Sequence, residues 1–146
     1  MKIKLFTAAL AALALIACEK TPTPIVPEEA DYVGTVTVES SVGTVENTGA
    51  RVEFTPSEDG TTADLTLYEI SFSPKMPMTL DVIIPGVAVV STPEKITFSA
   101  DEIIPFAMGV EFPRYLVTEL AGEIVGNKMT FSLKFGGTPT SFVGEK

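Results

Sequence analysis

From Asp31 onward, the chain is a succession of short segments in which apolar and polar residues alternate. Clusters of glycine, proline, serine and asparagine, the residues typical of turns, separate these segments. The alternation is clearest at residues 129–135, which read MTFSLKF. A period of two predicts β-strands with one buried face, and no useful run of helical periodicity follows residue 18.

The alternating or wholly apolar runs lie at residues 32–39, 50–54, 65–72, 78–84, 87–90, 95–98, 116–124, 129–135 and 141–144. They amount to about eight antiparallel strands. At this length an all-β, up-and-down barrel is the natural arrangement, because closure leaves no exposed strand edges. The first and last strands must then pair. The outward stripe is polar, which predicts a barrel that faces water and does not cross a membrane.

Four local features refine this prediction. The apolar positions change phase inside the run at 65–72, which predicts a β-bulge near Tyr68-Glu69. Ser40–Gly49 is rich in turn residues, and Pro85-Gly86 is predicted to end a strand. Asn127-Lys128 is predicted to be a hairpin turn.

The segment Ala100–Pro113 is the least regular part of the predicted domain. It carries many apolar side chains, but Pro105 and Gly109 interrupt them. Three interpretations stay open for it: a short strand, a loop that folds over one end of the barrel, or a segment that docks a partner protein.

The N-terminal segment has the features of a secretory signal peptide. Lys2 and Lys4 precede thirteen uncharged residues, Leu5 to Ala17. A helix of that length spans about 20 Å at ~1.5 Å per residue, which is too short for a hydrocarbon core of ~30 Å. A basic start, a short apolar run and small residues at the end therefore favour a cleaved signal over a transmembrane anchor.

Leu15-Ile16-Ala17-Cys18 looks like a lipobox, in which cleavage precedes a cysteine that carries lipid. Cys18 is the only cysteine of the chain, and acyl chains on it would anchor the protein to a membrane. The alternative is an ordinary signal peptide with Cys18 as a bystander. The chain thus divides into a signal peptide (1–17), a lipidated cysteine with a proline-rich tether (18–30) and a β-barrel domain (31–146).

The charge of the chain excludes one class of partner. Ten basic and nineteen acidic side chains give a formal charge of −9, and loss of Lys2 and Lys4 leaves eight against nineteen, or −11. Such a surface repels phosphate backbones, so no nucleic acid is expected as a partner. Anionic lipid headgroups would also be repelled, so membrane attachment must come from the acyl chains.

The residue types argue against catalysis. The chain has no histidine, which removes the usual catalytic dyads and triads and most zinc and copper sites. Asp81, Glu119 and Glu123 are the best candidates for paired carboxylates, but their positions in the alternation point outward, as solvated strand charges do. The acidic turn at residues 56–60 lacks the ligand spacing of a calcium loop. We expect no enzyme activity, cofactor or metal.

Several motifs resemble one protein family. Tyr32-Val33-Gly34-Thr35 opens the domain, and Met76-Pro77-Met78 leads into the segment 81–87, DVIIPGV. Gly122-Glu123-Ile124 then precedes 127–131, NKMTF, and Ser141-Phe142-Val143-Gly144 closes the chain. In these motifs the chain is similar to the calycin-like, or lipocalin-like, β-barrel lipoproteins of Gram-negative gut bacteria. The resemblance implies an eight-stranded barrel with an apolar interior and no enzymatic activity. The Gly-x-Trp signature of true lipocalins is missing, so transport of retinoid-like ligands is not implied.

The sequence therefore predicts a lipoprotein anchored to the outer membrane, on its periplasmic or outer surface, that binds a small apolar or amphipathic ligand. Methionine and aromatic side chains adapt to irregular apolar ligands. Those that could line a cavity or its mouth are Tyr32, Met78, Phe106, Met108, Tyr115, Met129 and Phe131. The barrel could instead be filled by its own side chains. The alternative function is a structural or adaptor subunit that docks a protein of the cell envelope.

Overall fold

The computed structural model describes residues 23–146. The signal peptide and Cys18 predicted from the sequence lie outside the described residues. The strands are β1 (Ala30–Ser40), β2 (Gly43–Pro56), β3 (Thr62–Ile70), β4 (Leu80–Ser91), β5 (Ile96–Ile103), β6 (Phe106–Ala107), β7 (Val110–Glu111), β8 (Val117–Val125), β9 (Lys128–Phe135) and β10 (Thr138–Glu145). A 3₁₀ turn, η1, spans Pro113–Tyr115.

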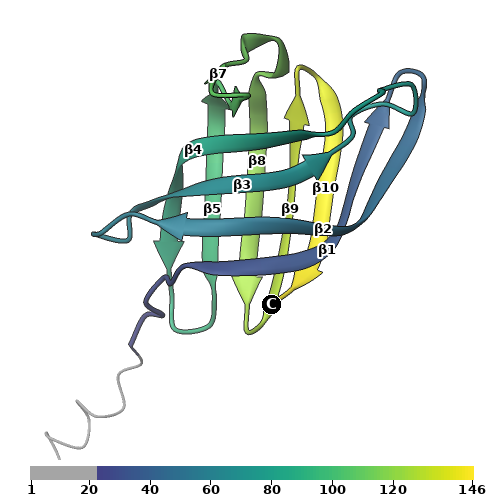
Figure 1. The fold of residues 1–146 in the computed structure, drawn as a ribbon. Coiled ribbons are helices and arrows are strands. Elements are labelled where there is room, and N and C mark those ends of the chain that lie inside the picture. Colours follow the sequence, from purple (N-terminus) through teal and green to yellow (C-terminus); the bar gives the residue numbers. More distant parts are fainter. Residues whose placement is uncertain (1–22) are drawn as a thin grey trace, which may run out of the picture.

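Eight of these strands form a closed antiparallel barrel, as the sequence predicted. Each long strand pairs with the next one along the chain, and β1 pairs with β10 from Val33 opposite Glu145 to Val38 opposite Thr140. In Figure 1, β1 to β4 run across the front, and β5, β8, β9 and β10 stand upright behind them with alternating directions. The small β6–β7 hairpin is an addition to this barrel that pairs with β4 at Val82 and Ile83.

Aromatic rings fill the middle of the barrel. Phe54, Phe98 and Phe142 are at most 1% exposed, and Phe131 is 4% exposed. The ring centroid of Phe98 lies 5.9 Å from that of Phe54 and 6.1 Å from that of Phe131. The centroids of Phe131 and Phe142 are 5.3 Å apart. A Cβ atom at position 122 would lie only 2.5 Å from the ring of Phe98 and from the Cβ of Phe131. Because that is too close for non-bonded carbon atoms, glycine is required there. The interior is thus packed at this level.

Bulges give the barrel its curvature. Between Leu67 and Ile70, β3 has one residue more than the facing segment of β4, and Glu69 adopts a φ of 53°. The bulge predicted near Tyr68-Glu69 is therefore confirmed. A second bulge, at Pro85-Gly86 of β4, corrects the prediction that a strand ends there: β4 continues through this bend to Ser91. Proline and glycine are typical of both features, so the sequence alone does not separate them.

Two predicted turns are also corrected. Ser40–Gly49 is mostly strand, because a two-residue turn at Ser41-Val42 leads directly into β2. Both faces of β2 are largely exposed from Gly43 to Gly49, so the segment lacks the apolar alternation that marks a strand. The hairpin turn predicted at Asn127-Lys128 lies one residue earlier, because Val125 pairs with Lys128 and Gly126 takes a φ of 60°.

Candidate functional site

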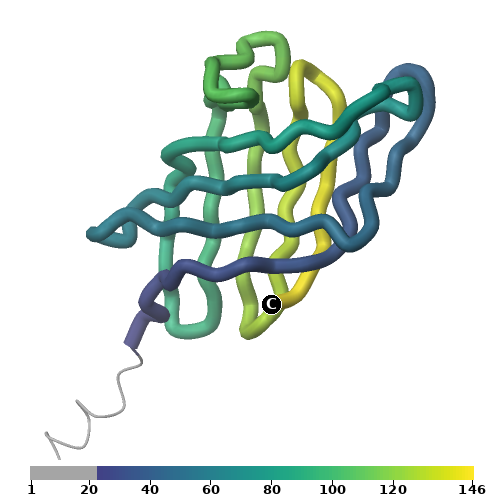
Figure 2. The backbone as a smooth tube through the Cα atoms, in the orientation of Figure 1, coloured from purple at the N-terminus to yellow at the C-terminus, as the bar shows by residue number. Residues whose placement is uncertain are grey.

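The end of the barrel away from the tether carries a pocket, here called the mouth pocket. The loops 41–42, 71–79, 104–116 and 136–137 gather at this end, whereas the tether joins the opposite one (Figure 2). The pocket has a volume of about 370 Å³. It is lined by Ser41, Phe72, Ser73, Lys75, Met76, Arg114, Tyr115, Phe135 and Thr138. All four loops, or the strand ends beside them, therefore contribute to it.

Packed aromatic rings form the apolar side of the mouth pocket. Tyr115 stacks on Phe72 with centroids 4.9 Å apart and on Phe112 with centroids 5.5 Å apart. Phe135 meets Phe72 edge to face at 5.0 Å. Phe72 and Phe135 are buried, and Tyr115 is half-buried at the rim. An apolar ligand would therefore meet rings that are already held in place.

Local hydrogen bonds fix the loop that carries Phe72 and Met76. The Asn47 side chain bridges β2 to this loop, since its amide nitrogen donates to the Ser71 carbonyl at 3.1 Å and its oxygen accepts from the Ser71 N–H at 2.9 Å. The Met76 N–H donates to the Ser73 carbonyl at 3.0 Å, and the Phe72 N–H lies 3.2 Å from the Met76 sulfur. The pocket wall is therefore preorganised by the fold.

The opposite end of the barrel is covered by the tether. The Ile25 N–H donates to the Thr92 carbonyl at 3.1 Å, in the turn between β4 and β5. A smaller pocket of about 310 Å³ lies beside Ile25 and is lined by Ile25, Val26, Glu28, Tyr32, Ile96, Ile124, Gly126 and Lys146. Burial raises the pKa of Tyr32 at this end.

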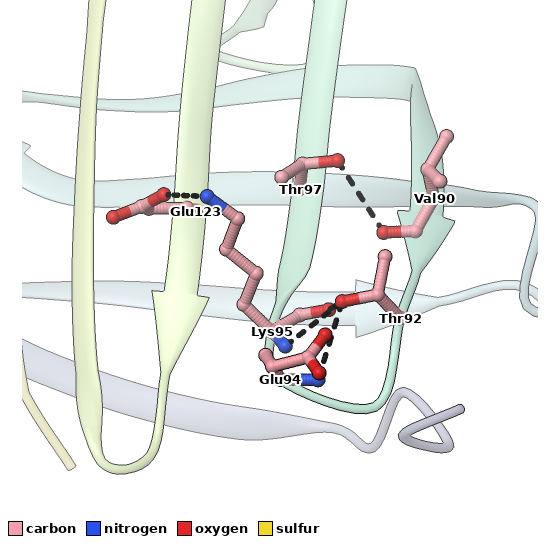
Figure 3. A network of polar contacts seen from close by, with 6 residues as sticks. All are labelled: Val90, Thr92, Glu94, Lys95, Thr97 and Glu123. Atoms are coloured by element: carbon pink, nitrogen blue, oxygen red, sulfur yellow. Dashed lines mark hydrogen bonds and ion pairs between the residues drawn. The ribbon is translucent and has the colours of Figure 1, made fainter. Parts of the chain in front are cut away.

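Polar contacts link the residues of the turn that receives the tether, as Figure 3 shows. The Thr92 hydroxyl oxygen accepts from the N–H groups of Glu94 at 3.3 Å and Lys95 at 3.1 Å. The Lys95 ammonium group then reaches Glu123 of β8 at 3.0 Å. These contacts hold the Thr92 carbonyl in position for the Ile25 N–H.

The structure does not bring the seven ligand-lining candidates together. Tyr115 lines the mouth pocket, and Tyr32 lies at the tether end. Met129 and Phe131 are buried in the core. Phe106 and Met108 belong to the β6–β7 hairpin, where Phe106 is half-buried and Met108 is 67% exposed, and Met78 is 60% exposed in the loop before β4.

Sequence reasoning did not single out most of the residues of the mouth pocket. Phe72 and Phe135 were assigned to strands, while Lys75, Met76 and Arg114 lie in loops whose meeting point depends on barrel closure. The local signal was an aromatic residue at the end of each of two apolar runs, Phe72 before Ser73-Pro74 and Phe135 before Gly136-Gly137.

The carboxylates considered for catalysis point outward, as their positions predicted, and each has a partner. Asp81 accepts from the Glu69 N–H at 2.8 Å. Glu119 pairs with Lys134 at 3.2 Å, and Glu123 pairs with Lys95. Across residues 23–146, no group of three or more metal-binding side chains of the His, Cys, Asp or Glu type is present.

A polar cluster on the outer face of β1 to β3 is also satisfied internally. The Arg51 guanidinium lies 3.8 Å from the centre of the Tyr68 ring and pairs with Asp31 at 3.1 Å. The Tyr68 hydroxyl donates to Glu53 at 2.6 Å, which lowers the pKa of Glu53 and raises that of Tyr68. This exposed cluster joins neighbouring strands and leaves the mouth pocket as the better candidate site.

Comparison of the chain with protein-family models, curated proteins and solved structures found no match. In the part of the chain that the structure describes, no helix has the length and apolar character needed to cross a membrane.

Proposed function

We propose that this protein is a non-enzymatic lipoprotein of the cell envelope, anchored to the outer membrane through Cys18, that binds a small apolar or amphipathic ligand in its mouth pocket. The lipobox-like segment 15–18 supports the anchoring. The closed barrel and the motifs that resemble calycin-like lipoproteins support a binding role without catalysis.

The observation that carries the binding proposal is the convergence of four loops on an aromatic pocket at one end of the barrel. Its volume of about 370 Å³ falls within the ~300–1,000 Å³ typical of small-molecule sites. The middle of the barrel is filled by phenylalanine rings, so a ligand is expected to bind at the mouth and not deep inside. Tyr115 and Met76 would contact its apolar part.

A neutral fluorescent amphiphile tests this proposal. N-phenyl-1-naphthylamine, titrated into the mature chain produced without acylation, should show saturable enhancement of its emission. Tyr115→Ala removes a rim ring and should weaken binding about tenfold, equivalent to ~1.4 kcal/mol. Met78→Ala, an exposed methionine outside the pocket lining, is the matched control and should bind like the parent. Absence of saturable binding, or equal weakening by both variants, would count against the mouth pocket.

An adaptor role is the second candidate, because the β6–β7 hairpin exposes apolar side chains. Met108 is 67% exposed, Val110 56% and Ile104 38%. β7 pairs only with β6 among the described strands, so it presents a free edge that another chain could extend. A photo-crosslinking residue at Met108 should then capture an envelope protein in cells, whereas one at Val90, 60% exposed on β4, should not. Equal labelling at both positions argues against this role.

A further inference from the structure

Two basic side chains of this acidic protein, Lys75 and Arg114, line the mouth pocket. The chain has a formal charge of −9, and within residues 23–146 three ion pairs engage Arg51, Lys95 and Lys134. Lys75, Arg114, Lys128 and Lys146 take part in no ion pair in this range, and of these four Lys75 and Arg114 line the mouth pocket. They come from two different loops, 71–79 and 104–116, that meet only because the barrel closes.

The lining of the mouth pocket contains no aspartate or glutamate. Two cations therefore face a pocket from which acidic side chains are absent, although acidic residues outnumber basic ones nineteen to ten in the chain. Beside the cations lie hydroxyl groups, on Ser41, Ser73 and Thr138, that can donate hydrogen bonds to a bound anion. This polar rim adjoins the aromatic wall formed by Phe72 and Tyr115.

We propose that the ligand of the mouth pocket is an amphipathic anion, with its acidic group between Lys75 and Arg114 and its apolar body against the aromatic wall. This inference rests on the proposed binding function and specifies its ligand class. The guanidinium of Arg114 can bind a carboxylate, sulfonate or phosphate through two parallel hydrogen bonds, and Lys75 adds a second charge. Phe72 and Tyr115 lie within 20° of parallel, which favours a flat apolar body.

Two probes that share one apolar body isolate the contribution of charge. 8-Anilino-1-naphthalenesulfonate carries a sulfonate, and N-phenyl-1-naphthylamine carries none. At low salt the mature chain should bind the sulfonate at least tenfold more tightly than the neutral probe. This preference should shrink as the salt concentration rises from 0.05 to 0.5 M, because rim charges are screened.

The double variant Lys75→Gln/Arg114→Gln should abolish this preference, so that it binds the sulfonate and the neutral probe with equal affinity. Lys128→Gln removes an exposed cation near the tether end and should keep the preference of the parent. If the parent binds the neutral probe but shows no preference for the sulfonate, the inference is wrong and the binding function stands. A preference that survives in the double variant also overturns the inference. If neither probe binds, the binding function itself fails.

Acidic amphiphiles exist as dissolved molecules and as lipids in a bilayer, and two further measurements separate these sources. Equilibrium dialysis with decanoate, at concentrations below micelle formation, reports a dissolved ligand. Sedimentation with phosphatidylglycerol vesicles, compared with phosphatidylcholine vesicles, reports a lipid headgroup. Either form of binding supports the inference if the double variant loses it, and the absence of both overturns it.

Discussion

Phe142 shows how one side chain holds the barrel closed. It lies in β10 opposite Val36 of β1, at the seam between the last strand and the first. Its ring is 1% exposed and stacks 5.3 Å from Phe131 of β9. Gly144, two residues later, has no side chain, and a Cβ there would collide with the Phe142 ring. The ring therefore fills the inner side of the seam.

Phe142→Ala should lower the free energy of unfolding by roughly 3–5 kcal/mol, because it removes a buried ring and leaves a cavity. Urea denaturation of the variant and the parent gives the difference directly. Val143→Ala is the matched control, since Val143 is the next residue of β10 but is 52% exposed. An equal effect of both substitutions would show that the seam does not depend on the buried ring.

The carboxylate of Asp59 links one turn to the pH of the medium. Its pKa is lowered to about 2, chiefly by the Thr61 N–H at 3.0 Å and then by the hydroxyls of Ser57 and Thr61. A depressed pKa contributes stability above the unfolded value of 3.8 that is lost as the pH falls toward about 2. Asp59→Asn removes the carboxylate and with it this pH-dependent contribution to stability. The stability of the variant should therefore change less than that of the parent between pH 4 and pH 2. Thermal midpoints of the variant and the parent, measured between pH 4 and pH 2, test this prediction. It is wrong if the two midpoints fall in parallel as the pH is lowered.

At the scale of elements, β3 and β4 are joined by two reciprocal bulges. Glu69 of β3 and Gly86 of β4 both have positive φ, 53° and 67°. The Glu69 N–H donates to Asp81 on β4 at 2.8 Å, and the Gly86 N–H donates to Asp64 on β3 at 2.9 Å. Each strand thus supplies the carboxylate that satisfies the bulge of the other. Bulges bend and twist strands, which lets this pair fold across the barrel.

Asp81→Ala should destabilise the fold by about 1–2 kcal/mol, because the Glu69 N–H loses its charged acceptor. The Glu69 amide should also exchange with solvent faster than in the parent, which NMR hydrogen exchange measures. Asp101→Ala is the control, since Asp101 is exposed on β5 and its side chain makes no hydrogen bond within residues 23–146. Unchanged exchange at Glu69 in Asp81→Ala would mean that the carboxylate does not hold the bulge.

The sequence was sufficient for the barrel but not for its site. Alternating side chains indicate which face of each strand is buried, and closure then requires the pairing of β1 with β10. The bulge at Glu119, with a φ of 54°, shifts the register, so Val117 and Leu120 are both buried although strict alternation would put them on opposite faces. The mouth pocket was missed for a different reason. Lys75 and Arg114 lie in loops, and no periodic pattern in the sequence shows that these loops line the same pocket.

At the scale of the whole molecule, the proposed lipid anchor and the mouth pocket use different parts of the chain. Most of the chain's charge is acidic, so its surface offers little attraction to anionic membranes. In the proposed function, Cys18 would attach the protein to the membrane, and a cationic rim of Lys75 and Arg114 would bind the ligand.

Cys18→Ser should block lipidation and leave an uncleaved precursor or an unanchored protein. Cell fractionation with mass spectrometry of the N-terminus distinguishes processed from unprocessed chains. Ser41→Ala is the control. Ser41 lies far along the chain from the cleavage site, so this variant should be processed and anchored like the parent. A processed Cys18→Ser protein that still sediments with membranes would show that the lipobox interpretation is wrong.

The hydrogen bond from Ile25 to Thr92 sets how far a lipid-anchored barrel can move from its bilayer. Ile25 is seven positions beyond Cys18, and an extended chain of that length reaches at most about 25 Å. If Cys18 carries lipid, a tether of this length would keep the covered end of the barrel close to the lipid headgroups and the mouth pocket turned away from them. The protein would therefore exchange its ligand with the surrounding water, and not laterally with the membrane that carries it.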